Sequence, residues 1–153
     1  MFFPLYQRYV PTIARLLMCV IFLLSGFTKV MDFSGNEGFM RAHGMTTGTA
    51  VLLTLAIIAE IGGGLALLLG FRVRAVSVLL FLYLIPTTLI FHNFWAESDS
   101  IMRQNQMLHF LKNLTILGGL LALSVAGAGA LSIDAAIARA RRPFWAFWQR
   151  RAI

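Results

Sequence analysis

The sequence predicts an all-α membrane protein, in which four transmembrane helices form one bundle over residues 1–153 and a C-terminal interfacial amphipathic segment follows them. Hydrophobic residues make up 59% of the 153 residues, and charged residues make up only 12%. A soluble domain carries about 25% charged residues and shows polar helix faces. The apolar runs of this chain are long and apolar on every side, so a bilayer is the solvent that suits them.

Four segments are long and apolar enough to cross a membrane. A helix needs about 20 apolar residues to span the ~30 Å hydrocarbon layer. The predicted spans lie near residues 12–30, 47–69, 73–92 and 106–126. A cleaved signal peptide is the alternative for the first span, because Arg8 and Arg15 precede an apolar run that ends in small residues. That run continues through Phe27 and Lys29, which favours a retained helix.

Basic residues predict the orientation. The chain carries 13 Lys and Arg against 6 Asp and Glu. The basic residues gather at the ends of the apolar runs, where anionic lipid headgroups lie. The positive charge therefore indicates membrane lipids rather than nucleic acid as the partner. The positive-inside rule then predicts a bacterial inner-membrane protein with both termini in the cytoplasm. The basic tail, residues 132–153, mixes apolar and arginine side chains and is expected along the inner membrane surface.

Several ionisable residues remain inside the spans, where each needs a partner or a water-filled cavity. Arg15 and Lys29 share one face of the first helix with Cys19. Glu60 lies on a glycine-rich stripe of the second span, deep enough that a solitary carboxylate is unfavourable. We expect Arg15 to be its partner, in a pair that either holds the bundle together or handles a ligand or protons.

A second polar group is predicted toward the outer side. Lys29 ends the first span and His92 the third, while His109, Lys112 and Asn113 lie near the start of the fourth. A pocket with these side chains suits a quinone head or a small oxyanion. The alternative is that the lysines snorkel to the interface and the histidines cap helices. The histidines lack a ligand motif, so no haem or metal site is predicted, and the single cysteine excludes an intramolecular disulfide.

Five blocks of sequence resemble a known family. They are Arg15 with residues 25–29, residues 60–71 with Arg74, residues 91–95, residues 110–114 with Gly118 and Gly119, and residues 127–134. In this order they resemble the DoxX family of bacterial inner-membrane proteins. The resemblance implies a single four-helix membrane domain. Some members of that family are membrane subunits of thiosulfate:quinone oxidoreductases, and another works with superoxide dismutase and a sulfurtransferase in oxidative and thiol stress.

The leading hypothesis is therefore a membrane subunit of a redox or thiol/sulfur-stress complex that binds quinone or another amphiphile. The candidate ligand-binding residues are Arg15, Lys29, Glu60, His92, His109, Lys112 and Asn113. The chain has no flavin, haem, iron–sulfur or CxxC motif, so a redox activity would require quinone and a partner subunit. A homo-oligomer is the alternative to an assembly with another protein. The alternatives are a structural or assembly protein without catalysis and a small transporter, which four helices without an inverted repeat do not favour.

Overall fold

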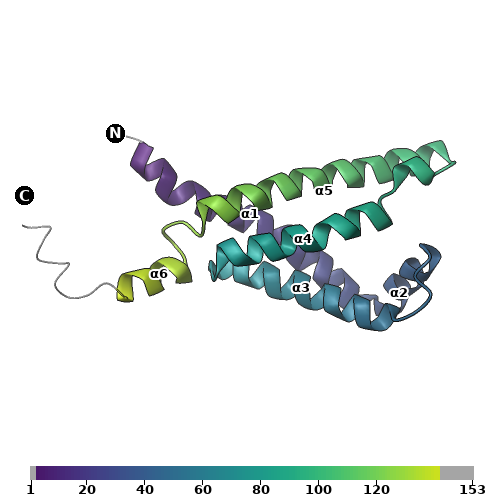
Figure 1. The fold of residues 1–153 in the computed structure, drawn as a ribbon, viewed down its shortest axis with the longest axis horizontal. Coiled ribbons are helices and arrows are strands. Elements are labelled where there is room, and N and C mark those ends of the chain that lie inside the picture. The colour runs from purple at the N-terminus through teal and green to yellow at the C-terminus, as the bar shows by residue number, and fades with distance from the viewer. Residues whose placement is uncertain (1–2, 142–153) are drawn as a thin grey trace, which may run out of the picture.

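The computed structural model describes residues 3–141 and consists of helices joined by short turns (Figure 1). The long helices are α1 (Phe3–Met31), α3 (Thr49–Leu69), α4 (Val73–Phe91) and α5 (Ser100–Ala126). The short ones are α2 (Phe33–Ala42), η1 (Phe94–Ala96) and α6 (Ile133–Ala140). Within residues 3–141, four helices are long and apolar enough to cross a membrane, which confirms the predicted all-α transmembrane fold.

The bundle consists of two helix pairs, because α1 packs mainly on α3 and α4 packs mainly on α5. The start of α1, the α3–α4 turn, the end of α5 and α6 lie together at one end, which we call the α6 end (Figure 1). The opposite end holds α2 and the α4–α5 connection, and we call it the α2 end. Ala130 N donates to Arg8 O at 2.9 Å, which joins the two ends of the described chain on one side of the bundle.

Several elements differ from the predicted spans. The first helix begins at Phe3 rather than near residue 12, and α5 begins at Ser100 rather than near residue 106. Both helices continue past the apolar stretch, because a helix does not have to end at the hydrocarbon boundary. Helix α2 was not predicted, and its 10 residues begin after Asp32, whose carboxylate accepts from Gly35 N. The predicted tail is helical over Ile133–Ala140, and residues 142–153 lie outside the described part.

Glycines set the distance between α1 and α3. A Cβ atom at Gly26 would lie 2.6 Å from Ile61 Cγ1, and one at Gly64 would lie 2.8 Å from Leu23 Cγ. Lipid tails are as apolar as leucine, so helices in a bilayer associate by close packing rather than by the hydrophobic effect. These two glycines therefore let the α1 and α3 backbones approach and fix how the helices align.

The interior is small and the outside is apolar. The buried apolar cluster comprises Cys19, Phe22, Leu67, Val73, Leu80, Leu84, Leu120 and Ala128. Large apolar side chains on the outer helix faces are exposed, with Leu17 at 72% and Val125 at 78% of full exposure. A soluble monomer rarely exposes contiguous apolar surface on all sides. Acyl chains are thus the natural solvent of these faces.

Arg15 fastens the α6 end of the bundle. Its guanidinium is buried, and Nε donates to Ala128 O at 3.0 Å while Nη1 donates to Leu67 O at 2.6 Å. Further bonds go to the carbonyls of Leu68 and Leu131. The carbonyls at the end of α3 have no partner within their own helix, and the guanidinium satisfies two of them. One side chain of α1 therefore joins α3 to the segment that follows α5.

Replacing Arg15 with methionine should destabilise the bundle by about 3 kcal/mol or more, because buried carbonyls lose charge-assisted hydrogen bonds. The free energy of unfolding in mixed micelles measures this. Arg139→Met is the matched control, since Arg139 is exposed on α6, and it should change stability by less than about 0.5 kcal/mol. Equal losses in the two variants would contradict the role assigned to Arg15.

At the other end, Glu37 connects α2 to the start of α3. Its Oε1 accepts from Thr49 Oγ1 at 2.7 Å and from Arg41 Nη2 at 2.6 Å. The Thr49 hydroxyl and the Arg41 guanidinium hold the pKa of Glu37 below its ordinary value of 4.5. Both bonds favour the charged carboxylate, so they stabilise the folded protein only while Glu37 is ionised.

The contribution of Thr49 to stability should therefore depend on pH. Thr49→Val should lower the thermal midpoint at neutral pH, and the difference from wild type should shrink below about pH 4, as the pH falls through the lowered pKa of Glu37. Thr54→Val is the control, because the Thr54 hydroxyl donates to Ala50 O and contacts no titratable group in the described hydrogen bonds. A pH-independent difference for Thr49→Val would refute this coupling.

Candidate functional site

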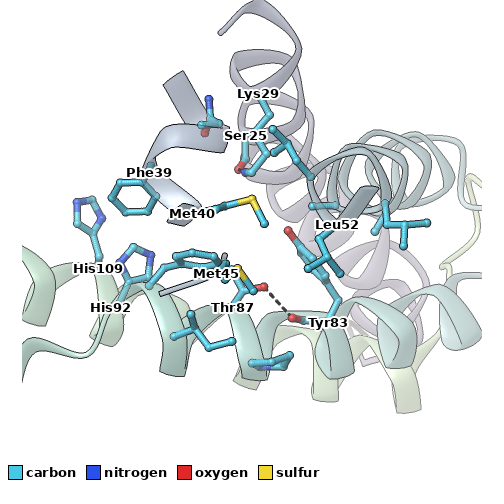
Figure 2. Close-up of a pocket in the computed structure, with 18 of the residues that line it drawn as sticks. Ser25, Lys29, Phe39, Met40, Met45, Leu52, Tyr83, Thr87, His92 and His109 are labelled. Carbon is cyan, nitrogen blue, oxygen red and sulfur yellow. Dashed lines mark hydrogen bonds between the residues drawn. The ribbon is translucent and has the colours of Figure 1, made fainter. Parts of the chain in front are cut away.

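A cavity of about 620 Å³ lies at the α2 end, between α2 and the four long helices (Figure 2). Its walls are mainly apolar side chains of α3 and α4, and Phe39 and Met40 of α2 also line it. The polar and ionisable residues that line it are Ser25, Lys29, Asn36, Tyr83, Thr87, His92, His109 and Lys112. The cavity therefore combines an apolar interior with a few polar side chains, as sites for amphiphilic ligands do.

A buried network forms one side of the cavity. Lys29 Nζ donates to both carboxylate oxygens of Glu60, at 2.9 and 2.8 Å, and to Ser25 Oγ at 2.7 Å. Tyr83 Oη donates to Glu60 Oε1 at 2.8 Å. Glu60 is only 4% exposed, so its charge needs these donors inside the bundle.

This Lys29–Glu60 network is closed and neutral. An ammonium group has three protons, and the three acceptors around Lys29 use all of them. The charge of Lys29 is compensated by Glu60, and the network joins α1, α3 and α4. Neither charge is therefore free to attract a further ion.

The prediction that Arg15 pairs with Glu60 is wrong. Gly26 packs opposite Ile61, which fixes the alignment of α1 and α3. At 1.5 Å per residue Lys29 lies about 4.5 Å along the axis from Gly26, whereas Arg15 lies about 16 Å away. Lys29 is therefore the cation within reach of Glu60, and Arg15 reaches carbonyls at the α6 end instead.

The second polar group, which we call the histidine group, consists of His92, His109, Lys112 and Gln106. His92 Nδ1 lies 2.8 Å from Gln106 Oε1, and the rings of His92 and His109 stack with centroids 5.2 Å apart. Lys112 Nζ lies 3.2 Å from His109 Nδ1. These contacts join α5 to the end of α4.

Hydrogen-bond roles follow from these contacts. The amide oxygen of Gln106 only accepts, so His92 Nδ1 carries a proton and the Nε2 of a neutral His92 is an acceptor. An ammonium only donates, so His109 Nδ1 accepts from Lys112 and the proton of a neutral His109 is on Nε2. The group thus offers a ligand one acceptor, one imidazole donor and the remaining ammonium protons.

Lys112 differs from Lys29 in its charge balance. Within residues 3–141, no carboxylate lies within ion-pair distance of Lys112, whereas Lys29 pairs with Glu60. The Lys112 side chain is exposed, and its described contact is with a neutral acceptor. The cavity therefore has one compensated cation and one uncompensated cation.

Four of the seven predicted site residues line the cavity: Lys29, His92, His109 and Lys112. Glu60 lies behind the wall as the partner of Lys29. Arg15 is at the α6 end, and Asn113 is buried, where its Nδ2 donates to Thr88 Oγ1 at 3.1 Å. The structure thus brings these lysines and histidines to one cavity, while their binding of a ligand stays a prediction.

Sequence reasoning missed Tyr83, Ser25 and Gln106. Tyr83 carried a usable signal, because a phenol in the middle of an apolar span requires a hydrogen-bond partner. Ser25 lies one helical turn before Lys29, which places both on one face. Gln106 gave no signal of its own, because polar residues are common near the start of α5.

Helix α2 was also missed, and it closes part of the cavity. Phe39 packs against Phe91 with ring centroids 5.7 Å apart, and His43 lies 5.6 Å from the same Phe91 ring. These aromatic contacts hold α2 against the end of α4. The short outer helix therefore belongs to the wall of the site.

Two family profiles match the chain. The DoxX profile matches residues 10–93, which is more than half of the sequence, and the SURF4 family profile matches residues 55–139. The two matches share residues 55–93, which include Glu60, Tyr83 and His92. Both therefore cover part of the cavity wall.

Two proteins of Escherichia coli strain K12 are similar over most of their length. The inner membrane protein YqjF is 38% identical over 123 residues, which cover 80% of this chain and 87% of that protein. The inner membrane protein YphA is 33% identical over 122 residues, covering 80% of this chain and 86% of that protein. No solved structure matches the chain significantly.

The Lys29–Glu60 pair should be strongly coupled. Glu60→Gln leaves a partly buried ammonium without its counterion and should cost about 3 kcal/mol of unfolding free energy. Lys29→Met should be similarly harmful, and the double variant should recover part of the loss, with a coupling energy of about 2 kcal/mol. A double-mutant cycle in micelles measures this, and strictly additive losses would exclude the pair as a unit.

Proposed function

We propose that this chain, which belongs to the DoxX family, is a membrane subunit that binds a quinone or a lipid-like amphiphile in the cavity at the α2 end. It would work in the bacterial inner membrane as part of a redox or thiol/sulfur-stress complex. The names of the two E. coli relatives support the inner-membrane location, and the four apolar helices support the membrane environment.

The observation that carries the proposal is the cavity. Its volume of about 620 Å³ lies within the range of about 300–1,000 Å³ that holds ligands of drug size. Apolar walls suit an isoprenoid or acyl tail. The histidine group supplies hydrogen-bond donors for the oxygens of a polar head.

Orientation follows from the charges at the α6 end. That end holds Arg8, Arg72, Arg74, Arg139 and Arg141. The positive-inside rule favours the cytoplasm for this side. We therefore propose that both termini are cytoplasmic and that the cavity lies toward the outer leaflet.

A partner subunit is part of the proposal. A bound quinone would supply two-electron redox chemistry, and the residues of this chain would bind and orient its head. The sequence contains one cysteine, Cys19, which is buried, and no cofactor motif. Electrons would thus have to come from another protein.

Filling the cavity should remove binding. Ala56 lines the cavity, and Ala56→Phe should lower by about tenfold or more the amount of quinone or lipid that co-purifies or that binds on titration, because the ring occupies the ligand volume. Ala122→Phe is the matched control, because Ala122 is exposed on α5 outside the cavity lining.

The control should retain wild-type binding. Both variants are compared by mass spectrometry of extracted ligands and by titration with a short-chain ubiquinone, with helix content checked by circular dichroism. Equal ligand retention by wild type and Ala56→Phe would contradict the proposal and favour a structural or assembly role.

A further inference from the structure

The uncompensated charge at the cavity suggests which ligands it selects. We propose that the site prefers an amphiphile with one tail whose head is an oxygen anion, held by Lys112 and the Nε2–H of His109. This inference rests on the proposed function, because it concerns the same cavity. Two sources share this chemistry: a long-chain carboxylate and a quinol in its phenolate form.

The first argument is the charge balance. Lys29 is fully paired with Glu60 and Ser25, so it adds no net attraction for a ligand. Lys112 has no carboxylate partner within residues 3–141. An ammonium at the edge of hydrocarbon is unfavourable unless water or an anion compensates it. An anionic head would supply that compensation and would leave the cavity neutral.

The second argument is geometry. Because Lys112 Nζ donates to His109 Nδ1, the ammonium is held beside a ring that lines the cavity rather than extended away from it. The same contact leaves His109 with its proton on Nε2, so ammonium and imidazole present donors together. Charge-assisted hydrogen bonds of this kind are about twice as strong as neutral ones. A neutral head would use only part of this donor set.

The remaining neighbours are consistent with an anion. The charged or titratable groups that interact electrostatically with His92 are His109, Lys112 and His43, and none of them is acidic. Glu60, the one fully buried carboxylate among the described residues, lies behind the cavity wall and is paired with Lys29. The groups that act on His92 and the pairing of Glu60 thus leave room for an anionic head at the histidine group.

The shape of the cavity suits a single tail. His92 and His109 lie on one side of it and Tyr83 and Leu52 on the other, with Met40 and Met45 between them (Figure 2). A head at the histidines would thus extend its tail along the two methionines, whose flexible thioethers adapt to apolar ligands. A cavity of about 620 Å³ suits one drug-sized molecule rather than a phospholipid with two acyl chains.

The first experiment compares a charged probe and a neutral probe of equal length. Dodecanoate and methyl dodecanoate are titrated by calorimetry into wild type, Lys112→Gln and Lys112→Arg in a neutral detergent. Lys112→Gln should weaken dodecanoate about tenfold and leave the methyl ester nearly unchanged, whereas Lys112→Arg should retain dodecanoate. Detergent partitioning is the same for every variant, so the comparison within each probe cancels it.

The second experiment tests the phenolate source. A decyl nitrophenol changes colour on ionisation, and its apparent pKa when bound should be lower in wild type than in Lys112→Gln by about one unit. A shift in this probe identifies a quinol-type head as a ligand. If Lys112→Gln weakens dodecanoate but the nitrophenol shows no shift, the ligand is a long-chain carboxylate. Either result supports a ligand with an anionic head.

The controls separate the two proposals. Arg103→Gln removes a cation of α5 that does not line the cavity, and it should leave dodecanoate affinity unchanged. If Lys112→Gln affects neither dodecanoate nor the nitrophenol while Ala56→Phe still blocks both, Lys112 merely snorkels and this inference is overturned, while amphiphile binding stands. If no probe binds to wild type, the proposed function itself fails.

Discussion

The structure depends on neutralising each buried charge within the bundle. A charge in hydrocarbon has no water to solvate it, so it must find protein partners or reach the interface. Glu60 obtains three hydrogen bonds from Lys29 and Tyr83, and these residues come from three different helices. The need to compensate the charge of Glu60 therefore positions α1, α3 and α4 relative to one another at mid-bundle.

Arg15 meets the same requirement in a different way. It has no carboxylate partner among the described residues, and four backbone carbonyls surround its guanidinium. Those carbonyls belong to the end of α3, where the last carbonyls of a helix lack its regular backbone donors, and to the segment after α5. Asp134 completes this end, because its carboxylate accepts from the backbone N–H groups of Arg72 and Val73, at 2.8 and 3.0 Å. These hydrogen bonds therefore join α1, the α3–α4 turn and α6 to one another at the α6 end.

Much of this fold was predictable from sequence, and the reason is physical. Four apolar runs of sufficient length have few alternatives to crossing a bilayer as helices. The face shared by Arg15, Cys19 and Lys29 was also predictable, because a 3.6-residue period places them together. The partner of Glu60 was not, because it depends on the alignment of α1 and α3, which the contacts of Gly26 and Gly64 determine. Periodicity identifies the face of one helix but not its axial position against another.

A pocket beside the lysines and histidines was predicted, but its walls and its extent were not, for a related reason. It requires α2, because Phe39 and the helix-ending His43 both contact Phe91, a residue far from them in sequence. It also requires that the two helix pairs separate at one end. Arg15 and Asp134 hold the pairs together at the α6 end, and Tyr83 joins α4 to Glu60 at mid-bundle.

Between Tyr83 and the α2 end, the polar contacts differ from those at the α6 end. Toward the α2 end the described side chains form polar bonds within each pair, such as His92 to Gln106 between α4 and α5. Figure 1 shows α2 and the start of α5 diverging there. A bundle joined by ionic and hydrogen-bonded contacts at one end and at its middle leaves volume at the other end. The closed Lys29–Glu60 network therefore does two things: it stabilises the fold, and it forms the inner limit of the space where Lys112 remains uncompensated.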